Sequence, residues 1–356
     1  MHMIQINSKD NYISVAKAIG IILMVIGHSG CPKLLRDFIY TFHMPLFFLC
    51  SGYFFKEIVS LYKLKSFFLK KMRGLYFPYL KWSVLFVLLH NVFYHCDIYN
   101  SYSHSTLYSM QDYAIQLVKA GSMTDFELVI KPFWFIKALL YASLSIAILS
   151  YVKEQFFSRM KYSHILLLFL FLSFILKIYP VKLPVLGDIS IITTSICYFS
   201  SGIVYRLYEN KLSYSIPILL ILFFVVFVGS AFFAFNDMKT VTYQDFFPYY
   251  FLSMSGIYMT FSLSKKIEET RMCRYFYYVG RNTMPIFALH LLVFKLGNAI
   301  KIWYFDLPPY LLSSHTAIYD HNEYFWLVYS FLGISFPLIL RELYIFTLRL
   351  LHPNSL

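Results

Sequence analysis

Long apolar segments separated by short polar ones occupy most of the chain. A segment of about 20 mostly apolar residues can cross a bilayer as one helix. This pattern predicts about ten spans, at residues 12–30, 38–55, 74–95, 132–151, 162–179, 188–208, 214–235, 246–264, 276–298 and 323–347. We therefore expect an all-α, polytopic transmembrane helical bundle. We also expect a single domain over residues 1–356, with no appended soluble domain.

The composition also indicates a membrane protein. Hydrophobic residues make up 59% of the chain and charged residues 14%, whereas soluble domains have about half apolar and about a quarter charged residues. A soluble fold would need one very large core with almost no polar surface to cover it. The first apolar segment carries Lys17 and is not followed by a small-residue cleavage pattern, so we expect a retained helix rather than a signal peptide.

The positions of the basic residues predict an orientation. A net charge of +13 could suit nucleic-acid binding, but the Lys and Arg residues fall between the apolar segments, as in cytoplasmic loops near anionic lipid. Residues 56–73 are strongly basic, whereas residues 95–131 carry more acids than bases. Placing 56–73 in the cytoplasm makes every second loop the more basic one. We expect a multi-pass protein of the cell inner membrane with both termini cytoplasmic, lipid around it and no nucleic-acid partner.

The sequence also allows predictions about the longest external segment and about the cysteines. The longest external segment, 96–131, mixes polar and aromatic residues, and we expect it to form a partial lid. The five cysteines are scattered, with no Cys-x-x-Cys spacing, so neither a disulfide framework nor a metal site is predicted.

Lys17 and His28 lie in the same apolar segment, with ten residues between them. Eleven helical steps of about 100° make roughly three turns, so both side chains share one helix face about 16 Å apart. Ionisable groups inside a span are costly and commonly face a polar cavity. The simpler alternative is that Lys17 extends to the cytoplasmic interface and His28 lies at the external one.

Two other histidines are candidates for the membrane interior. His43 lies near the external start of the second span, at the predicted depth of His28, and Ser51-Gly52 further on would allow close helix approach. His290 lies near the middle of the ninth span. Each has a structural alternative, since His43 could cap its helix and His290 could make a helix–helix hydrogen bond.

Other charged and aromatic groups could bind ligands. Lys70 and Arg73 belong to a basic run that could hold phosphate groups, although the run also serves as a topology signal. Trp134 and Lys137 place an aromatic ring and a charge at the external end of the fourth span, where Trp134 could also be an interfacial anchor. From these residues alone, an enzyme with a charged cytosolic donor and a transporter both fit.

Five motifs occur in a fixed order over residues 11 to about 295. They are Lys17 with His28; Phe42-His43-Met44-Pro45-Leu46-Phe47-Phe48 with Ser51-Gly52-Tyr53; Lys70 with Arg73; Trp134-Phe135; and Gly280-Arg281-Asn282-Thr283 with Ile286 and His290. This series resembles acyltransferase family 3, in particular its fucose 4-O-acetylase-like and polysaccharide O-acetyltransferase branch. Family members commonly have Arg at the positions of Lys17 and Lys70, so the charge is kept while the planar guanidinium contact is lost.

The resemblance implies a membrane-embedded O-acyltransferase that moves an acetyl group from cytoplasmic acetyl-CoA to a sugar hydroxyl of a cell-surface or exopolysaccharide glycan. It implies that Lys70 and Arg73 bind the nucleotide end of CoA and that the pantetheine arm passes Lys17. His28 would then act as a general base or carry the acyl group.

The remaining site residues have supporting roles under the same resemblance. His43 or His290 would orient His28 or polarise the thioester, and Trp134 and Lys137 would contact the substrate. No metal is expected, the partner is a glycan acceptor, and the choice between monomer and homodimer stays open. The main alternative is a transporter or flippase for a lipid-linked glycan, although no inverted repeat is detected. The second alternative is a non-catalytic membrane scaffold or sensor.

Overall fold

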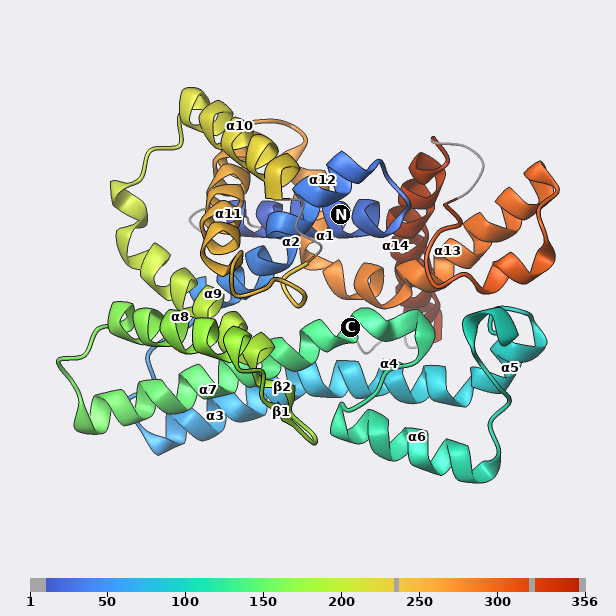
Figure 1. The fold of residues 1–356 in the computed structure, drawn as a ribbon, viewed down its shortest axis with the longest axis horizontal. Helices are drawn as coiled ribbons and strands as arrows, with labels where there is room; N and C mark the ends of the chain where they lie inside the picture. Colours follow the sequence, from blue (N-terminus) through green and yellow to red (C-terminus); the bar gives the residue numbers. More distant parts are fainter. Residues whose placement is uncertain (1–10, 234–236, 320–323, 352–356) are drawn as a thin grey trace.

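The computed structural model describes residues 11–233, 237–319 and 324–351, which are predominantly helical (Figure 1). Strands β1 (Lys182–Leu183) and β2 (Gly187–Asp188) form one short antiparallel hairpin in this part of the chain. The all-α prediction is therefore confirmed. The helices are α1 (Asn11–His28), α2 (Lys33–Tyr53), α3 (Leu61–Lys71), α4 (Phe77–Leu88), α5 (His90–His95), α6 (Met110–Ser122), α7 (Trp134–Phe156), α8 (Tyr162–Ile178), α9 (Ile189–Tyr208), α10 (Ile216–Phe233), α11 (Phe246–Glu268), α12 (Cys273–Arg281), α13 (Thr283–Phe305) and α14 (Trp326–Leu351), with a π-helical turn η1 (Met72–Tyr76) and 3-10 segments η2 (Ser101–Ser103), η3 (Leu128–Phe133), η4 (Glu209–Lys211) and η5 (Pro309–Ser313).

Five of the described helices are long and apolar enough to cross a membrane, namely α1, residues 128–156, α10, α13 and α14. Helix α8 is apolar but shorter. These helices identify a membrane protein, while the predicted number of about ten spans and the cytoplasmic termini stay predictions. Both chain ends, together with parts of the predicted spans 214–235 and 323–347, lie outside the described residues.

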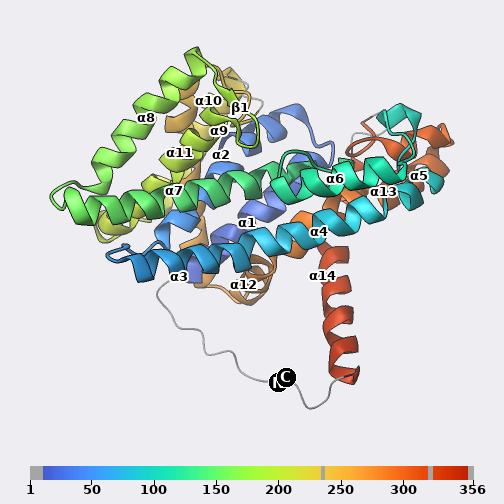
Figure 2. The ribbon, with the colours of Figure 1, turned by 90° about the horizontal axis from the view of Figure 1, so that it is seen from below.

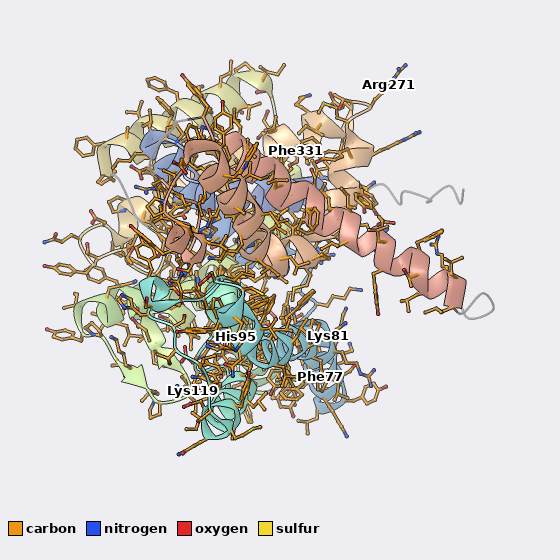
Figure 3. The ribbon with its side chains drawn as sticks, turned by 90° about the vertical axis from the view of Figure 1, so that its right-hand side faces the viewer. Phe77, Lys81, His95, Lys119, Arg271 and Phe331 are labelled. Atoms are coloured by element: carbon orange, nitrogen blue, oxygen red, sulfur yellow. The ribbon has the colours of Figure 1, made fainter. Side chains whose placement is uncertain are left out.

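The surfaces of α10 and α14 show why a membrane is needed. On α10, Val226 and Ser230 are buried, while the remaining Ile, Leu, Val and Phe side chains are largely uncovered by protein. Helix α14 extends away from the other helices toward its C-terminal end (Figure 2). Its Phe331 faces outward (Figure 3) and is 68% exposed. Apolar surface of this extent is stable in lipid rather than in water.

Two predicted spans have different boundaries in the structure. The basic run that precedes residue 74 is helical, and α3, η1 and α4 continue one another in a line beside α7 (Figures 1 and 2). Ser60 begins this helix by accepting a hydrogen bond from the Lys63 N–H at 3.3 Å. The span predicted at 276–298 is instead α12 and α13, which break at Asn282. Pro285 explains the break, because a continuous helix would place its ring against the carbonyl of Arg281.

Helix α2 lies at the centre of the bundle, between α1, α9 and α11. Glycines allow its backbone to touch that of α9. A Cβ on Gly52 would lie 1.9 Å from the carbonyl oxygen of Phe199, and one on Gly202 would lie 2.1 Å from that of Leu49. The close approach expected at Ser51-Gly52 is therefore present, and it fixes the position of the histidine-bearing part of α2.

The segment 96–131 is more ordered than an open lid. Its helix α6 packs along α4, where the hydroxyl groups of Tyr76 and Tyr79 donate to the carbonyls of Gly121 at 2.7 Å and Ala120 at 2.8 Å. Farther on, buried Glu127 pairs with His90 at 3.0 Å and accepts a hydrogen bond from the Tyr108 hydroxyl at 3.0 Å. These contacts fasten the segment to the helices beside it.

Candidate functional site

His28 is the last residue of α1, and the ring of Tyr40 from α2 lies against it. Gly27 makes this possible, because a Cβ there would lie 2.6 Å from the Tyr40 ring. The Tyr40 hydroxyl is 3.3 Å from His28 Nδ1 and 3.2 Å from the carbonyl oxygen of Gly27. The polar ring of Tyr40 therefore holds the His28 imidazole at the end of its helix.

His43 and His290 continue this group on either side. Their ring centroids lie 5.1 Å from Tyr40 and 5.5 Å from His28, respectively. His43, Tyr40, His28 and His290 thus form a continuous series of four rings, called the ring series below. Residues separated by up to 262 positions meet there.

Backbone contacts determine which nitrogens of two of these rings can accept a proton. His43 Nδ1 lies 2.9 Å from the Ile39 carbonyl, and His290 Nδ1 lies 3.0 Å from the Phe287 carbonyl. Because a carbonyl oxygen can only accept, both rings donate from Nδ1 and keep a lone pair on Nε2. The Nε2 atom of His290 is buried with no hydrogen-bond partner among the described residues.

A cavity of about 210 Å³, called the His cavity below, opens beside the ring series. It is enclosed by side chains of α1, α2 and α13 and by the segments that precede α7, α11 and α14. Its lining residues are Met24, His28, Tyr40, His43, Met44, Lys131, Pro132, Trp134, Asp237, Lys239, Phe287 and His315. His290 lies behind His28 and does not line it.

The structure separates the two residues expected to contact substrate. Trp134 lines the His cavity, and the Lys239 ammonium lies 4.9 Å from the centre of its ring. Lys137 is not among the lining residues. Its ammonium lies 6.0 Å from the Tyr141 ring centre and close to Gly187 of the hairpin. A substrate contact by Lys137 therefore stays a prediction without support from this cavity.

Lys17 shares α1 with His28 but lies in the N-terminal half of that helix. It is partly buried, near Cys50 of α2 and Arg281 of α12. It does not line the His cavity. Lys17 and Arg281 together place positive charge where α1 and α12 pack against each other.

Lys70 and Arg73 line a separate open groove of about 600 Å³ on α3 and η1. The other lining residues are Tyr62, Lys65, Ser66, Leu69 and Gly74. Lys71 turns inward instead, with its ammonium 5.2 Å from the Phe67 ring centre. Burial lowers the pKa of Lys71 to about 8, and the charge of Lys70 beside it acts in the same direction.

Several residues of the His cavity were not candidates in the sequence, namely Tyr40, Lys131, Asp237, Lys239 and His315. Four of them lie in connecting segments, where no helical period relates them to His28. Tyr40 lies three residues before His43, so helical spacing could have placed it on the same face.

His315 reaches the cavity because its loop is held by one face of α13. The Lys295 ammonium donates to the Ser314 carbonyl at 2.6 Å, and that of Lys301 donates to the Ile318 carbonyl at 2.8 Å. Asn298, between them on the helix, donates to the Thr316 carbonyl at 3.3 Å. Burial lowers the pKa of His315 to about 4, helped by the charges of Lys131 and Lys295, so this ring is neutral near pH 7.

The donor groups near the cavity are not arranged as a metal centre. Within residues 11–233, 237–319 and 324–351, no group of three or more His, Cys, Asp or Glu side chains is placed to hold a metal ion. The side-chain groups that face the cavity include imidazole, phenol and ammonium groups. Such groups can take up or release a proton and can hold a polar ligand in place.

Comparison with known protein families identifies a match to nearly the whole chain. The model of acyltransferase family 3, described as an acyltransferase domain, matches residues 10–342. No curated protein and no solved structure matches the chain. The matched range contains all four residues of the ring series and the groove residues Lys70 and Arg73.

Proposed function

Because the chain belongs to acyltransferase family 3 and has membrane-spanning helices, we propose that it moves an acetyl group from cytoplasmic acetyl-CoA to a sugar hydroxyl of a cell-surface or exopolysaccharide glycan. We place it in the fucose 4-O-acetylase-like and polysaccharide O-acetyltransferase branch, in the cell inner membrane. The ring series beside the His cavity is the observation that carries this proposal.

The proposed reaction replaces the thioester bond of acetyl-CoA with an oxygen ester bond to the sugar. The oxygen of the sugar hydroxyl attacks the thioester carbonyl, a C–O bond forms, and the C–S bond of acetyl-CoA breaks. His28 takes the hydroxyl proton and returns it to the CoA sulfur, so atoms and charge balance. In the alternative route, His28 first accepts the acetyl group and then passes it to the sugar. Both routes need His28 at the cavity wall, held there by Tyr40.

The other rings support His28 in this scheme. His43 offers its Nε2 lone pair to the His cavity, where it can accept a hydrogen bond from the acceptor hydroxyl. His290 lies behind His28 and fixes the ring from its far side. Trp134 provides an apolar wall on which a sugar face can rest.

Acetyl-CoA is the proposed donor substrate, and the groove on α3 is its proposed nucleotide site. Lys70, Arg73 and Lys65 place positive charges along one groove, where they can make charge-assisted hydrogen bonds to phosphate groups. The predicted orientation puts this groove in the cytoplasm, where acyl-CoA is available. Lys17 and Arg281 would lie along the path from this groove toward His28.

A transfer assay tests the proposed function. The purified protein in lipid nanodiscs is given acetyl-CoA labelled in the acetyl group, together with envelope glycan extracted from the source cells. We expect alkali-labile label in the glycan, as an O-acetyl ester. Movement of lipid-linked glycan across the bilayer with no label transferred would instead identify the flippase alternative.

The double substitution Lys70→Ala with Arg73→Ala is expected to weaken acetyl-CoA binding by about tenfold or more, because two charge-assisted contacts are lost. Isothermal titration of the detergent-solubilised protein measures this directly. The matched control is Lys56→Ala with Lys63→Ala, which removes the same charge from residues that do not line the groove. Equal weakening in both variants would mean that the basic segment acts only through its total charge.

A further inference from the structure

Three cavities meet at Lys131. This residue lines the His cavity and also a larger cavity of about 570 Å³, called the vestibule below. It lines a third cavity of about 210 Å³ as well, which contains His90 and Glu127. His315 is shared by the vestibule and the His cavity. A ligand in the vestibule would therefore lie next to the His cavity, with the Lys131 ammonium at the junction.

The vestibule is built from two segments that are far apart in sequence, 102–131 and 311–319. They are joined directly, since the Ser313 hydroxyl donates to the Asn100 side chain at 2.5 Å and the Asn100 amide donates to the Tyr310 carbonyl at 3.2 Å. The ring centroids of Tyr102 and Tyr310 lie 5.2 Å apart beside these hydrogen bonds. With the loop of His315 also held by Lys295, the walls are fixed before a ligand arrives.

The lining is suited to a carbohydrate. Hydroxyl groups of Ser103, Ser314 and Thr316 and the rings of Tyr102 and Tyr319 line the vestibule. A few polar groups among aromatic walls are typical of sites that orient a small polar ligand. The vestibule volume also exceeds that of the His cavity, so several sugar units could remain there while one hydroxyl enters the His cavity.

The acidic and basic side chains that line the three cavities differ in whether they already have partners within the chain. The carboxylates among the lining residues are Asp125, Glu127 and Asp237, and each has a partner within this chain. Asp125 lies 3.4 Å from Lys119, and Glu127 pairs with His90. Asp237 accepts hydrogen bonds from the backbone N–H groups of Lys239 at 2.5 Å and Thr240 at 3.1 Å. Asp125 and Glu127 are therefore each paired with a basic side chain, whereas Asp237 is held by neutral N–H groups and keeps its negative charge beside the His cavity.

Lys131 differs from them. Its side chain is exposed at the junction and, across the residues that the structure describes, the ammonium forms neither an ion pair nor a hydrogen bond. Lys239 adds a second positive charge to the His cavity, since its ammonium faces the Trp134 ring rather than a carboxylate. The His cavity is thus lined by Lys131 and Lys239 against Asp237, and the vestibule by Lys131 with no carboxylate among its described lining residues. The linings of these two cavities therefore carry a net positive charge, which favours a ligand with a negative group.

Resting on the proposed function, we propose that the vestibule binds an anionic glycan, whose carboxylate or phosphate group pairs with Lys131 while a neighbouring hydroxyl enters the His cavity. The pairing selects acidic over neutral acceptors and sets the distance between the anionic group and the acetylated oxygen. Because a carboxylate of an acidic sugar and a phosphate of a carrier-linked sugar share this chemistry, the experiment separates them.

The first test can be run before the acceptor is identified. Glycan labelled in the transfer assay is separated by anion exchange at neutral pH, and we expect the label in the charged fraction. Mild acid, which cleaves a sugar pyrophosphate but leaves the O-acetyl ester, is then applied. Label that stays charged indicates a carboxylate, and label that becomes neutral indicates a phosphate. Label in the neutral fraction from the start overturns this inference but leaves the proposed function standing, whereas absence of any label in glycan removes both.

The second test uses Lys131→Ala. We expect the apparent KM for the glycan to rise about tenfold or more, with kcat and the KM for acetyl-CoA near the wild-type values. Lys131→Arg should keep most of the affinity. Added salt should weaken glycan use by the wild-type protein more than by Lys131→Ala, a response that a purely structural lysine would not produce.

Lys182→Ala is the matched control. Lys182 is an exposed lysine of β1 and lines none of the three cavities. Its loss should leave the KM for the glycan unchanged. An equal rise of KM in both variants, or a fall in kcat alone in Lys131→Ala, would contradict the assignment of Lys131. The fractionation of wild-type product decides the question independently if Lys131→Ala fails to fold.

Discussion

His28→Ala is expected to lower acetyl transfer by about 10²–10⁴-fold while acetyl-CoA binding stays close to wild type. The substitution removes the imidazole that lies between Tyr40 and His290 at the wall of the His cavity. The proposed nucleotide groove with Lys70 and Arg73 lies on other helices and should be unaffected. Transfer to glycan and binding of acetyl-CoA are measured on the same purified preparation.

His95→Ala provides the control for this experiment. His95 is an exposed histidine at the end of α5 (Figure 3) and does not line the His cavity. Its substitution should leave the transfer rate unchanged. A His28→Ala variant that turns over near the wild-type rate would place the chemistry elsewhere, with His43 the next residue to test.

Gly52→Ala is expected to be among the most destabilising single-methyl additions at the described glycines, as are those at Gly202 and Gly280, where a new Cβ would also meet a backbone carbonyl oxygen. The new Cβ at Gly52 would lie 1.9 Å from the carbonyl oxygen of Phe199, and a backbone atom of a packed helix cannot move aside as a side chain can. Overpacking of a core costs about 1–3 kcal/mol and sometimes more. We expect a clearly lower melting temperature in detergent and less monodisperse protein.

The reciprocal variant and a control sharpen this prediction. Gly202→Ala meets the carbonyl oxygen of Leu49 from the other helix and should have a similar effect. Gly121→Ala adds the same methyl group to α6, where nothing lies within 4 Å, and should leave the melting temperature unchanged or slightly raised. A Gly52→Ala protein as stable as Gly121→Ala would show that α2 and α9 are not in backbone contact.

Apolar segment length predicted most of the helices, because the hydrocarbon thickness of a membrane imposes a length on each spanning helix. Boundaries set by side-chain detail were less accessible. The sequence 276–298 is mostly apolar, yet Pro285 divides it at Asn282. The basic run before residue 74 is too charged to be recognised as a span, although Leu64 and Phe67 recur at helical spacing and pack against the core. Its helix α3 begins at the Ser60 cap and packs against α7.

The candidate site was predictable in part. His28, His43 and Trp134 were identified because ionisable or aromatic groups are uncommon at their positions in a span, and the structure brings them to one cavity. Lys131 and His315 lie in connecting segments. Their meeting depends on the loop after α13, which side chains of α13 hold by hydrogen bonds, and not on any local sequence pattern. Lys137 satisfied the same rule as His28, but its helix turns it toward the hairpin. The direction of a side chain is fixed by neighbours that a single segment does not reveal.

The π-helical turn η1 has a consequence for the geometry of the long helix that contains it. Such a turn holds one residue more than an α-helical turn, and each residue advances an α-helix by about 100°. The side chains of α3 and α4 are therefore out of angular phase, although the two helices run as one rod. Nine steps of about 100° would place Lys70 and Tyr79 on opposite faces of an uninterrupted α-helix, and the extra residue of η1 changes the angle between them by about 100°. A deletion of one residue at Gly74 would restore the phase and rotate the basic groove about the rod axis without removing a single charge.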